Sequence, residues 1–456
     1  MPARTGVVPT SELARVSEAR YRAGRTRSQA LSRQASGVFP QGVSGAAKHF
    51  DPFPIFVASA GGSHVADVDD NDYVDLLMGA GPMLLGHGHP AVVEAIREQV
   101  ARMTNPMMPI ERSMLLAERI RGHMPYLERL RFANTGSEAT RSAVRVARAA
   151  TGRRLIAKCE GNFHGSDDTF LVSTHSRRLA GSDARPEPVA DYAGLAPDVL
   201  DGVILLPFND VQAAVEIIHH HAADLAGVIM EPVAFSSGGA VPATREFAAA
   251  VRAATRRHAI ALIFDEVLCA YRMGLAGAPA YLGVAPDLAT IGKAVGGGMP
   301  LAAFGGSAEW MEAALGTEAG ARKIFQSGTF TENPVSIEAG LAVLDVLENE
   351  PVLERADAIA ELMREGLQRE LDAHGEEAVV TGAGSIFQVH FGAREIRNRR
   401  DVLRSELERT RAFLLGLVAH GVLWPPIHPA VTSGAHDEDD VELLLEATRA
   451  VLSAAE

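Results

Sequence analysis

The chain has 456 residues, of which 47% are hydrophobic and 22% are charged, as in an ordinary globular protein. This length predicts two or three domains, whose core needs neither a metal nor a disulfide. The formal net charge of −14 argues against nucleic acid or an anionic membrane as the main partner.

The cysteines and the N-terminus predict a cytoplasmic protein. Cys159 and Cys269 form no CxxC pair and no zinc-ligand pattern, so we expect buried thiols in a reducing compartment. No apolar stretch approaches the roughly 20 residues of a membrane helix, and the N-terminus lacks the apolar core of a secretory signal. Its arginines are compatible with an organelle transit peptide, but Glu12 and Glu18 favour a solvated helix instead.

The first predicted elements are a polar helix over residues 11–33 and a hairpin over residues 55–77 that turns at Asp69-Asp70-Asn71. From about residue 129 to 295, helical patterns such as Glu138–Ala150 and Arg245–His258 alternate with short apolar runs. The runs read as strands are Leu130–Ala133, Leu155–Lys158, Val203–Pro207, Gly227–Met230 and Ala259–Phe264. This alternation predicts an α/β fold with a mostly parallel, doubly wound sheet.

Long helices with a few strands, near Phe387–Phe391, follow residue 335 and predict a smaller α+β domain. The predicted division has three parts. Residues 1–75 form an N-terminal helix and hairpin segment that packs with the small domain, residues 76–335 form the large domain, and residues 336–456 form the small domain.

Candidate site residues follow the apolar runs, because ligands bind beyond the carboxyl ends of the strands in an open parallel sheet. After Leu130–Ala133, a turn with Gly136 and Ser137 leads into a helix. Backbone N–H groups and hydroxyls at a helix start can cradle a phosphate. A simple helix cap is the alternative.

Asp265 and Lys293 are the two charged candidates. Asp265 ends an apolar strand, where a carboxylate is costly without a cationic partner such as a protonated ring nitrogen. The alternative is an aspartate bonded to neighbouring backbone N–H groups. Lys293 stands between glycines and apolar residues, where desolvation favours the neutral amine that attacks carbonyls. A solvated surface lysine is the alternative.

These three features together fit pyridoxal 5'-phosphate (PLP), which needs a lysine for its Schiff base, a carboxylate for its ring nitrogen and an anion cradle. A fourth segment, Glu160–Gly165, directly follows a strand. Phe163 is a candidate to stack on one face of the cofactor ring while Val267 covers the other. A core aromatic is the alternative for Phe163.

The chain resembles the class III, fold-type I aminotransferases, and most closely their glutamate-1-semialdehyde aminomutase branch, from about residue 37 to 440. The segments that carry the resemblance are Asp67–Asp75, Gly81–Pro90, Asn134–Thr140, Glu160–Gly165, Glu231–Val233, Asp265–Val267, Gly292–Pro300 and Ser327–Pro334. Several long motifs in the same order make this resemblance specific. It implies a fold-type I PLP transferase that acts as a homodimer with shared active sites.

The resemblance also implies residue roles. Lys293 would hold PLP and carry the proton between substrate and cofactor, and Asp265 would pair with the pyridine nitrogen. Gly136 and Ser137 would bind the phosphate, and Thr329 would reach the phosphate of the partner subunit's cofactor. The remaining implied contacts are Phe163 and His164 beside the cofactor and Glu138 on the substrate side.

The substrate region departs from the aminomutase pattern. Lys48 replaces an arginine that holds the substrate carboxylate, so the bidentate fork is lost. Residues 425–433 lack the glutamate of the aminomutase pattern and place His428 near the predicted pocket. Ser236 replaces an asparagine of that pattern, and Phe391 follows His390 where an apolar run is usual. An intact cofactor set with an altered substrate set favours an aminotransferase that uses a small-molecule amino donor and an oxo acceptor.

Two alternatives stay open. An intramolecular aminomutase would need a lid that retains the oxo intermediate, and residues 166–197 are the candidate. A non-catalytic PLP-binding dimer is the second.

Three other patterns are set aside. The calcium-like stretch from Asp67 has Asp72 and Met78 where glycine and glutamate are needed. The run His219–His221 suits a helix end better than a metal, and Asp437–Asp440 suits a helix start.

Overall fold

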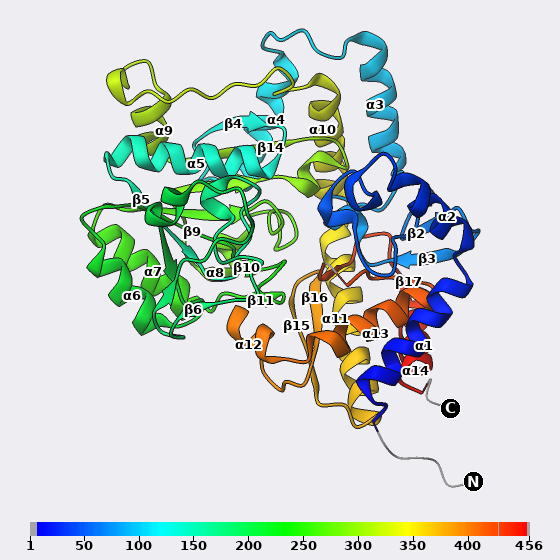
Figure 1. Cartoon of the computed structure of the whole chain (residues 1–456). Coiled ribbons are helices and arrows are strands. Elements are labelled where there is room, and N and C mark those ends of the chain that lie inside the picture. The colour runs from blue at the N-terminus through cyan, green and yellow to red at the C-terminus, as the bar shows by residue number, and fades with distance from the viewer. Residues whose placement is uncertain (1–6, 427, 454–456) are drawn as a thin grey trace, which may run out of the picture. The chain divides into compact units, whose positions relative to one another are not determined.

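The structure is a computed structural model that describes residues 7–426 and 428–453 (Figure 1). The chain forms two compact units. Unit 1 comprises Met1–His89, Pro351–Ile396 and Asp401–Glu456, and unit 2 comprises Pro90–Glu350 and Arg397–Arg400. The units thus divide at residues 89/90 and 350/351, and the domain boundaries at 75/76 and 335/336 stay a prediction. None of the helices within the described ranges combines the length and apolar composition that crossing a bilayer requires.

Unit 2 is built on a seven-stranded sheet with the order β4-β14-β13-β12-β9-β5-β8. Its strands are β4 (Arg129–Ala133), β5 (Leu155–Cys159), β8 (Val203–Leu206), β9 (Leu225–Met230), β12 (Ala261–Glu266), β13 (Leu288–Ile291) and β14 (Ala302–Gly306). Strands β13, β12, β9, β5 and β8 pair in parallel, whereas β14 pairs antiparallel with both β13 and β4. Six strands therefore end at the same edge, as the apolar runs predict for a mostly parallel sheet.

The helices of unit 2 connect these strands, and Figure 1 shows α6 and α7 side by side. They are α3 (Pro90–Arg102), α4 (Glu111–His123), α5 (Gly136–Thr151), α6 (Val211–His220), α7 (Arg245–Arg257), α8 (Ala278–Leu282), α9 (Ala308–Leu315) and α10 (Pro334–Asn349). Short hairpins, β6 (Ala180–Gly181) with β7 (Pro186–Glu187) and β10 (Val233–Ala234) with β11 (Val241–Pro242), lie between them.

Helix α5 is fixed at both ends and along one face. The Thr135 hydroxyl accepts the N–H of Glu138 as an N-cap, and Gly152 ends the helix in the left-handed region (φ 71°). Its alanines and valines pack on strands β5, β9, β12, β13 and β14 in one buried cluster. This packing holds the start of α5 at the carboxyl edge of the sheet.

Unit 1 contains two sheets and long helices. Strands β1 (Val57–Gly61), β2 (His64–Asp67), β3 (Asp72–Asp75) and β17 (Val422–Leu423) form one sheet, and β15 (Ala378–Ala383), β16 (Ile386–Phe391) and β18 (Ala430–Val431) form the other. Its helices are α1 (Thr10–Ala23), α2 (Thr26–Ala35), α11 (Val352–Ala373), α13 (Leu407–Ala419) and α14 (Glu438–Leu452), while α12 (Arg399–Arg404) crosses from unit 2.

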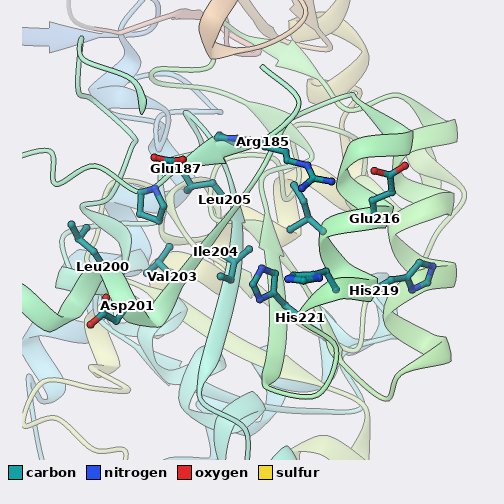
Figure 2. Close-up of a pocket in the computed structure, with 14 residues that line it drawn as sticks. Arg185, Glu187, Leu200, Asp201, Val203, Ile204, Leu205, Glu216, His219 and His221 are labelled. Carbon is teal, nitrogen blue, oxygen red and sulfur yellow. The ribbon is translucent and has the colours of Figure 1, made fainter. Parts of the chain in front are cut away.

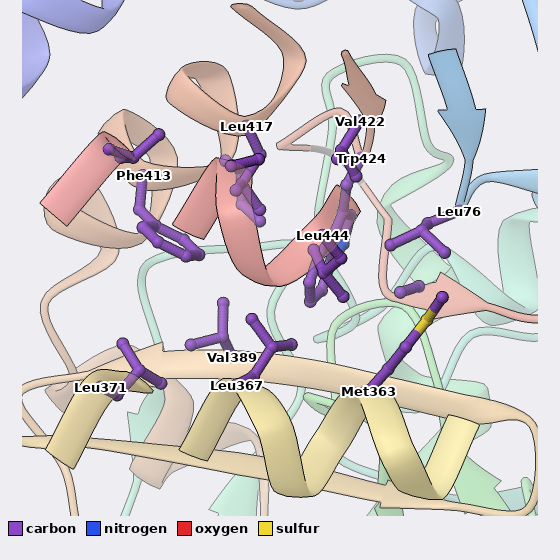
Figure 3. Packing of buried hydrophobic residues seen from close by; sticks show 14 of the residues in the cluster. Leu76, Met363, Leu367, Leu371, Val389, Phe413, Leu417, Val422, Trp424 and Leu444 are labelled. Carbon is purple, nitrogen blue, oxygen red and sulfur yellow. The ribbon is translucent and has the colours of Figure 1, made fainter. Parts of the chain in front are cut away.

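The core of unit 1 lies between these helices and β16. Figure 3 shows Leu367 of α11 pointing toward Leu444 of α14, and Met363 of α11 pointing toward Leu76. Phe413 of α13 lies on the side of Leu371. As predicted, acidic residues start α14: Asp437 caps it in a capping box with Asp440.

Two predicted elements are wrong in detail. Residues 11–33 are two helices, because the chain breaks at Gly24 and Arg25, and the buried Arg25 guanidinium donates to Val418 O and Tyr73 Oη. Residues 55–77 contain three strands, because Gly62 and Ser63 make a further turn before the predicted turn at residues 69–71.

Candidate active site

Three of the predicted motifs meet at the side chain of Val267, at the carboxyl edge of the unit 2 sheet. A Cβ at Gly136 would lie 2.8 Å from Val267 Cγ1, and a Cβ at Gly292 would lie 3.2 Å from the same atom. Both positions need glycine because the valine methyls occupy the space that a side chain would take. The start of α5, the end of β12 and the loop before Lys293 are therefore in direct contact.

The fourth motif packs against the start of α5. Gly165 has a φ of 96°, and a Cβ there would lie 2.3 Å from Ser137 Oγ. The Ser137 hydroxyl accepts the N–H of Ser166 at 3.1 Å, which leaves its own proton available to an anion. Gly136 and Ser137 are half-buried first-turn residues of a 16-residue helix, so the geometry suits the predicted phosphate cradle. Thr135 caps the helix, while Gly136 and Ser137 remain available to a phosphate. The two interpretations of this turn, a helix cap and a phosphate cradle, are therefore compatible.

Asp265 is buried and held by three groups. His164 Nδ1 lies 2.8 Å from Asp265 Oδ2, while the Thr290 hydroxyl and the N–H of Val267 donate to Oδ1 at 3.0 and 3.2 Å. Thr290 is the parallel-strand partner of Asp265, so the sheet register itself places this hydroxyl. One backbone N–H bond thus exists, as the alternative interpretation expected, but an imidazole and a hydroxyl accompany it.

Lys293 is separated from the end of β13 by Gly292 alone, and its backbone is in the left-handed region, with a φ of 47°. Its Nζ lies 5.0 Å from the centre of the buried Phe235 ring. Burial lowers the pKa of Lys293 to about 8, although the carboxylate of Glu231 acts in the opposite direction. A solvated surface lysine, the alternative interpretation, is wrong, and a strained, partly neutral amine is typical of a functional site.

Glu231 is a buried carboxyl group to which the sequence analysis assigned no role. It follows the end of β9, and its Oε2 accepts the N–H of Phe163 at 2.8 Å. Burial raises the pKa of Glu231 to about 8, and nearby Asp265 raises it further. The rule that selected Asp265, a carboxyl at the end of an apolar strand, would also have selected Glu231.

Phe163 is 37% exposed, so the core-aromatic alternative is wrong. Its ring meets the ring of His175 edge-on, with the centroids 5.3 Å apart. The next residue, His164, is buried; burial lowers its pKa, and its Nε2 has no hydrogen-bond partner among the described residues. The exposed ring of Phe163, packed against His175 and next to the buried imidazole of His164, suits contact with a planar ligand.

The remaining predicted residues of unit 2 have local partners. The Glu138 carboxylate accepts the N–H of Asn134 at 2.9 Å, which ties it to the start of its own helix. Ser236 is half-buried in the turn between β10 and β11. Thr329 is exposed, and its carbonyl accepts from Asn105 Nδ2 at 3.0 Å. Their predicted roles at substrate and partner cofactor stay predictions.

Lys48 and His428 belong to unit 1. Lys48 is exposed, and its Nζ donates to Ser44 Oγ at 3.1 Å. His428 follows the short strand β17, and its carbonyl accepts from Trp424 Nε1 at 3.1 Å. Their approach to a substrate stays a prediction.

Arg399 is a further site neighbour that sequence reasoning missed. A Cβ at Gly161 would lie 2.4 Å from Arg399 Cβ, and the guanidinium donates to the carbonyls of Ser237, His175 and Ser176. Burial lowers the pKa of Arg399 to about 10. No pattern near residue 399 indicates this contact, because it joins segments more than 160 residues apart.

A pocket of about 860 Å³ opens elsewhere on unit 2, along the edge strand β8 (Figure 2). Figure 2 shows Ile204 of β8 beside His221, which directly follows α6, with His219 of α6 farther to the right. His219 Nδ1 lies 2.8 Å from His258 Nε2. None of the predicted site residues lines this pocket.

The residues at the carboxyl edge fit PLP. Lys293 supplies a buried amine with a lowered pKa, Asp265 supplies a carboxylate fixed by His164, and α5 supplies an anion cradle. The unpartnered Nε2 of His164 and Nδ2 of Asn162 are buried polar atoms beside this set. Such orphaned groups are costly unless a ligand completes them.

Comparisons with known proteins agree with this chemistry. The family model described as aminotransferase class-III matches residues 45–434. A glutamate-1-semialdehyde 2,1-aminomutase from Methanocella arvoryzae is 38% identical over 426 residues, which cover 92% of this chain and 97% of the relative.

Solved structures of transaminases are also similar to this chain. An omega-transaminase from Sphaerobacter thermophilus is 34% identical with a TM-score of 0.86, covering 93% of this chain and 97% of the other. A transaminase with PLP bound is 29% identical with a TM-score of 0.83, covering 94% and 98%. The fold is therefore the fold-type I PLP transferase fold, and the chain belongs to the class-III aminotransferases, a family of PLP-dependent enzymes.

Proposed function

We propose that this enzyme is an aminotransferase that moves an amino group from an amino acid donor to a keto or aldehyde acceptor in two alternating half-reactions. The observation that carries the proposal is the buried amine of Lys293, which lies beside Phe235 and close to the fixed carboxylate of Asp265. When bound, PLP supplies an aldehyde that joins amines covalently and a ring that accepts electrons.

Lys293 would hold the cofactor and move the proton. With a pKa of about 8, its Nζ is partly neutral at mildly alkaline pH and can take the proton from the donor's α-carbon. The same Nζ would then deliver the proton to the cofactor side, and the acceptor half-reaction would reverse these transfers. Asp265, fixed by His164 and Thr290, would keep the cofactor ring nitrogen protonated.

The remaining contacts would orient the cofactor. Gly136 and Ser137 would hold its phosphate at the start of α5, and Phe163 and Val267 would cover the two faces of its ring. Thr329, exposed on its own subunit, would complete the phosphate site of the partner in a homodimer. The altered residues Lys48, Ser236 and His428, with Glu138, would set the choice of donor and acceptor.

A second candidate function is an intramolecular aminomutase, which never releases its oxo intermediate. Its support is the 38% identity to a curated aminomutase over nearly the whole chain. The loss of the carboxylate-binding fork at Lys48 favours the aminotransferase. The third possibility, a non-catalytic dimer, is set aside because the family is one of enzymes.

The test uses the purified holoenzyme and a panel of amino donors. If the enzyme is an aminotransferase, a good donor bleaches the visible cofactor band and releases one oxo acid per site. The same measurement on Lys293→Ala should give no oxo acid, whereas Lys323→Ala, at an exposed lysine of the same unit, should match the wild type.

Two results would overturn the proposal. If the band changes only with diamines or amino-aldehydes and no oxo product leaves the protein, the enzyme is an aminomutase. If Lys293→Ala retains turnover, the proposed role of this residue is wrong.

A further inference from the structure

Lys158 is a fully buried lysine that the proposed chemistry does not use. It lies on β5 between Leu205 of β8 and Ile229 of β9 and is 0% exposed. The chain has only four lysines and relies on arginine for nearly all other cations. A lysine here is therefore a specific choice, because its compact ammonium directs three donors from one atom.

The ammonium of Lys158 binds one segment. Its Nζ donates to the carbonyls of Phe170 at 3.4 Å and Val172 at 2.8 Å, and to the hydroxyl of Thr174. A buried ammonium is costly unless it is fully hydrogen-bonded, and these three oxygens meet that need. Lys158 thus fixes the backbone of residues 170–174 from within the sheet.

These residues in turn hold the loop that carries Phe163 and His164. The carbonyl of Ser173 accepts the N–H of Gly161 at 2.9 Å. Because Thr174 Oγ1 accepts from Lys158, its own proton is available to the carbonyls of Asn162 and Phe170, each 3.0 Å away.

The loop is also held from its other side. Asn162 Oδ1 accepts the N–H of Glu231 at 2.9 Å, and Glu231 Oε2 accepts the N–H of Phe163. The chain of contacts from Lys158 to Phe163 therefore runs through Thr174 and Asn162 without a gap.

A carboxylate secures the opposite side of the same segment. The Asp191 side chain accepts the N–H groups of Thr174, His175 and Ser176 at 2.8 to 3.0 Å. His175 is the residue whose ring supports Phe163. The segment is thus held by a cation at its carbonyls and by an anion at its N–H groups.

We propose that Lys158 is a positioning residue for the cofactor: through residues 170–174 and Asn162 it holds Phe163 and His164 in place for the PLP ring. The inference rests on the proposed contact of PLP with these two residues. It also assigns residues 170–176, together with Asp191, to the fixed part of the candidate lid, residues 166–197.

The test compares Lys158→Met and Thr174→Val with the wild type, as apoproteins titrated with PLP. Losing a charge-assisted hydrogen bond, or the hydroxyl that relays it, should weaken PLP binding by about tenfold or more. The visible circular dichroism of the loaded protein should also lose amplitude, because the ring is less firmly oriented. Amide hydrogen exchange at Gly161 should become faster in both variants.

A matched control separates positioning from general stability. Arg153 also donates to three backbone carbonyls of unit 2, those of Leu225, His258 and Ala259, but beside the opposite ends of the strands. Arg153→Met should lower the melting temperature and leave the PLP dissociation constant within about twofold.

Unchanged PLP affinity and dichroism in Thr174→Val would overturn the inference, and so would the same result in a folded Lys158→Met. If Lys158→Met does not fold, Thr174→Val decides, since it removes one hydroxyl and keeps the buried charge. Because binding is measured without turnover, a wrong reaction assignment would leave these results unaffected.

Discussion

Lys293 and Glu231 form the electrostatic centre of the site, and burial acts against the charge of both. The pKa of each is about 8, from opposite directions, so near neutral pH the amine is still protonated and the carboxyl is largely protonated as well. The buried amine of Lys293 destabilises the apoprotein, because its burial outweighs the attraction of the nearby carboxyl groups of Glu231 and Asp265. That cost is the price of having a lysine whose neutral form is accessible at working pH.

This cost predicts a pH-dependent stabilisation by Lys293→Met in the apoprotein. Between pH 8 and 10.5 the unfolded state keeps the lysine proton and the folded state has lost it, so wild-type stability rises with pH across this window. Below pH 8 both states are protonated and the cost is constant. The variant should therefore be more stable by on the order of 3 kcal/mol at pH 7, and the difference should shrink towards pH 10.5.

Urea unfolding of both apoproteins at pH 7 and pH 9.5 measures this difference. Lys323→Met removes an exposed lysine from the same unit and should show no pH-dependent gain. A stability difference that is the same at both pH values would mean that the pKa of Lys293 is not lowered in the folded chain.

At the scale of elements, the start of α5 and the end of β12 act as one structure because Val267 fills the space beside Gly136 and Gly292. This predicts that Gly136→Ala displaces the valine, since the new Cβ would lie 2.8 Å from its Cγ1. We expect PLP binding to weaken by at least about tenfold, because the N–H groups at the helix start would shift. Titration of the apoprotein with PLP measures the change.

A second substitution tests the cause. In the double variant Gly136→Ala with Val267→Ala, the clash is relieved and part of the affinity should return. Gly122→Ala is the control, because a Cβ there meets nothing within 4 Å. Equal affinity in Gly136→Ala and Gly122→Ala would show that this close contact does not hold the phosphate site.

The sequence alone predicted a strand or a helix correctly where one hydrophobic pattern, either an apolar run or a helical period, was clear. The strands from Leu130 to Phe264 were found because short apolar runs alternated with amphipathic helices, and the rule about carboxyl ends then selected Asp265 and Lys293. The polar helix over residues 11–33 was wrong because its break depends on Arg25, whose partners lie 48 and 393 residues away. Local patterns carry no information about such contacts.

The same limit applies within the site. Thr290 and Asp265 are neighbours only through the register of β12 and β13, and Lys158 supports the Phe163 loop only through the segment that covers it. Spacing predicted which residues carry the chemistry. The residues that hold them in place depend on pairings between distant segments.

At the scale of the whole molecule, an apolar surface surrounds Thr329. Met107 and Met108 are 64% and 72% exposed, and Phe325 and Phe330 are 81% and 64% exposed. The two loops that carry them are joined by the hydrogen bond from Asn105 to the Thr329 carbonyl. Apolar surface of this kind is typical of a protein–protein interface, and it supports the proposed homodimer.

Subunit mixing tests whether Thr329 serves the partner's site. In a Lys293→Ala and Thr329→Ala heterodimer, the second subunit keeps Lys293 and receives an intact Thr329 from the first. Neither variant alone has a complete site, but random mixing of subunits should restore about a quarter of the wild-type sites, because half of the dimers are mixed and each has one complete site. PLP retained per subunit and oxo acid released in one turnover measure this recovery. If Thr329 instead acted on its own subunit's cofactor, no mixture would contain a complete site, and mixing would restore nothing.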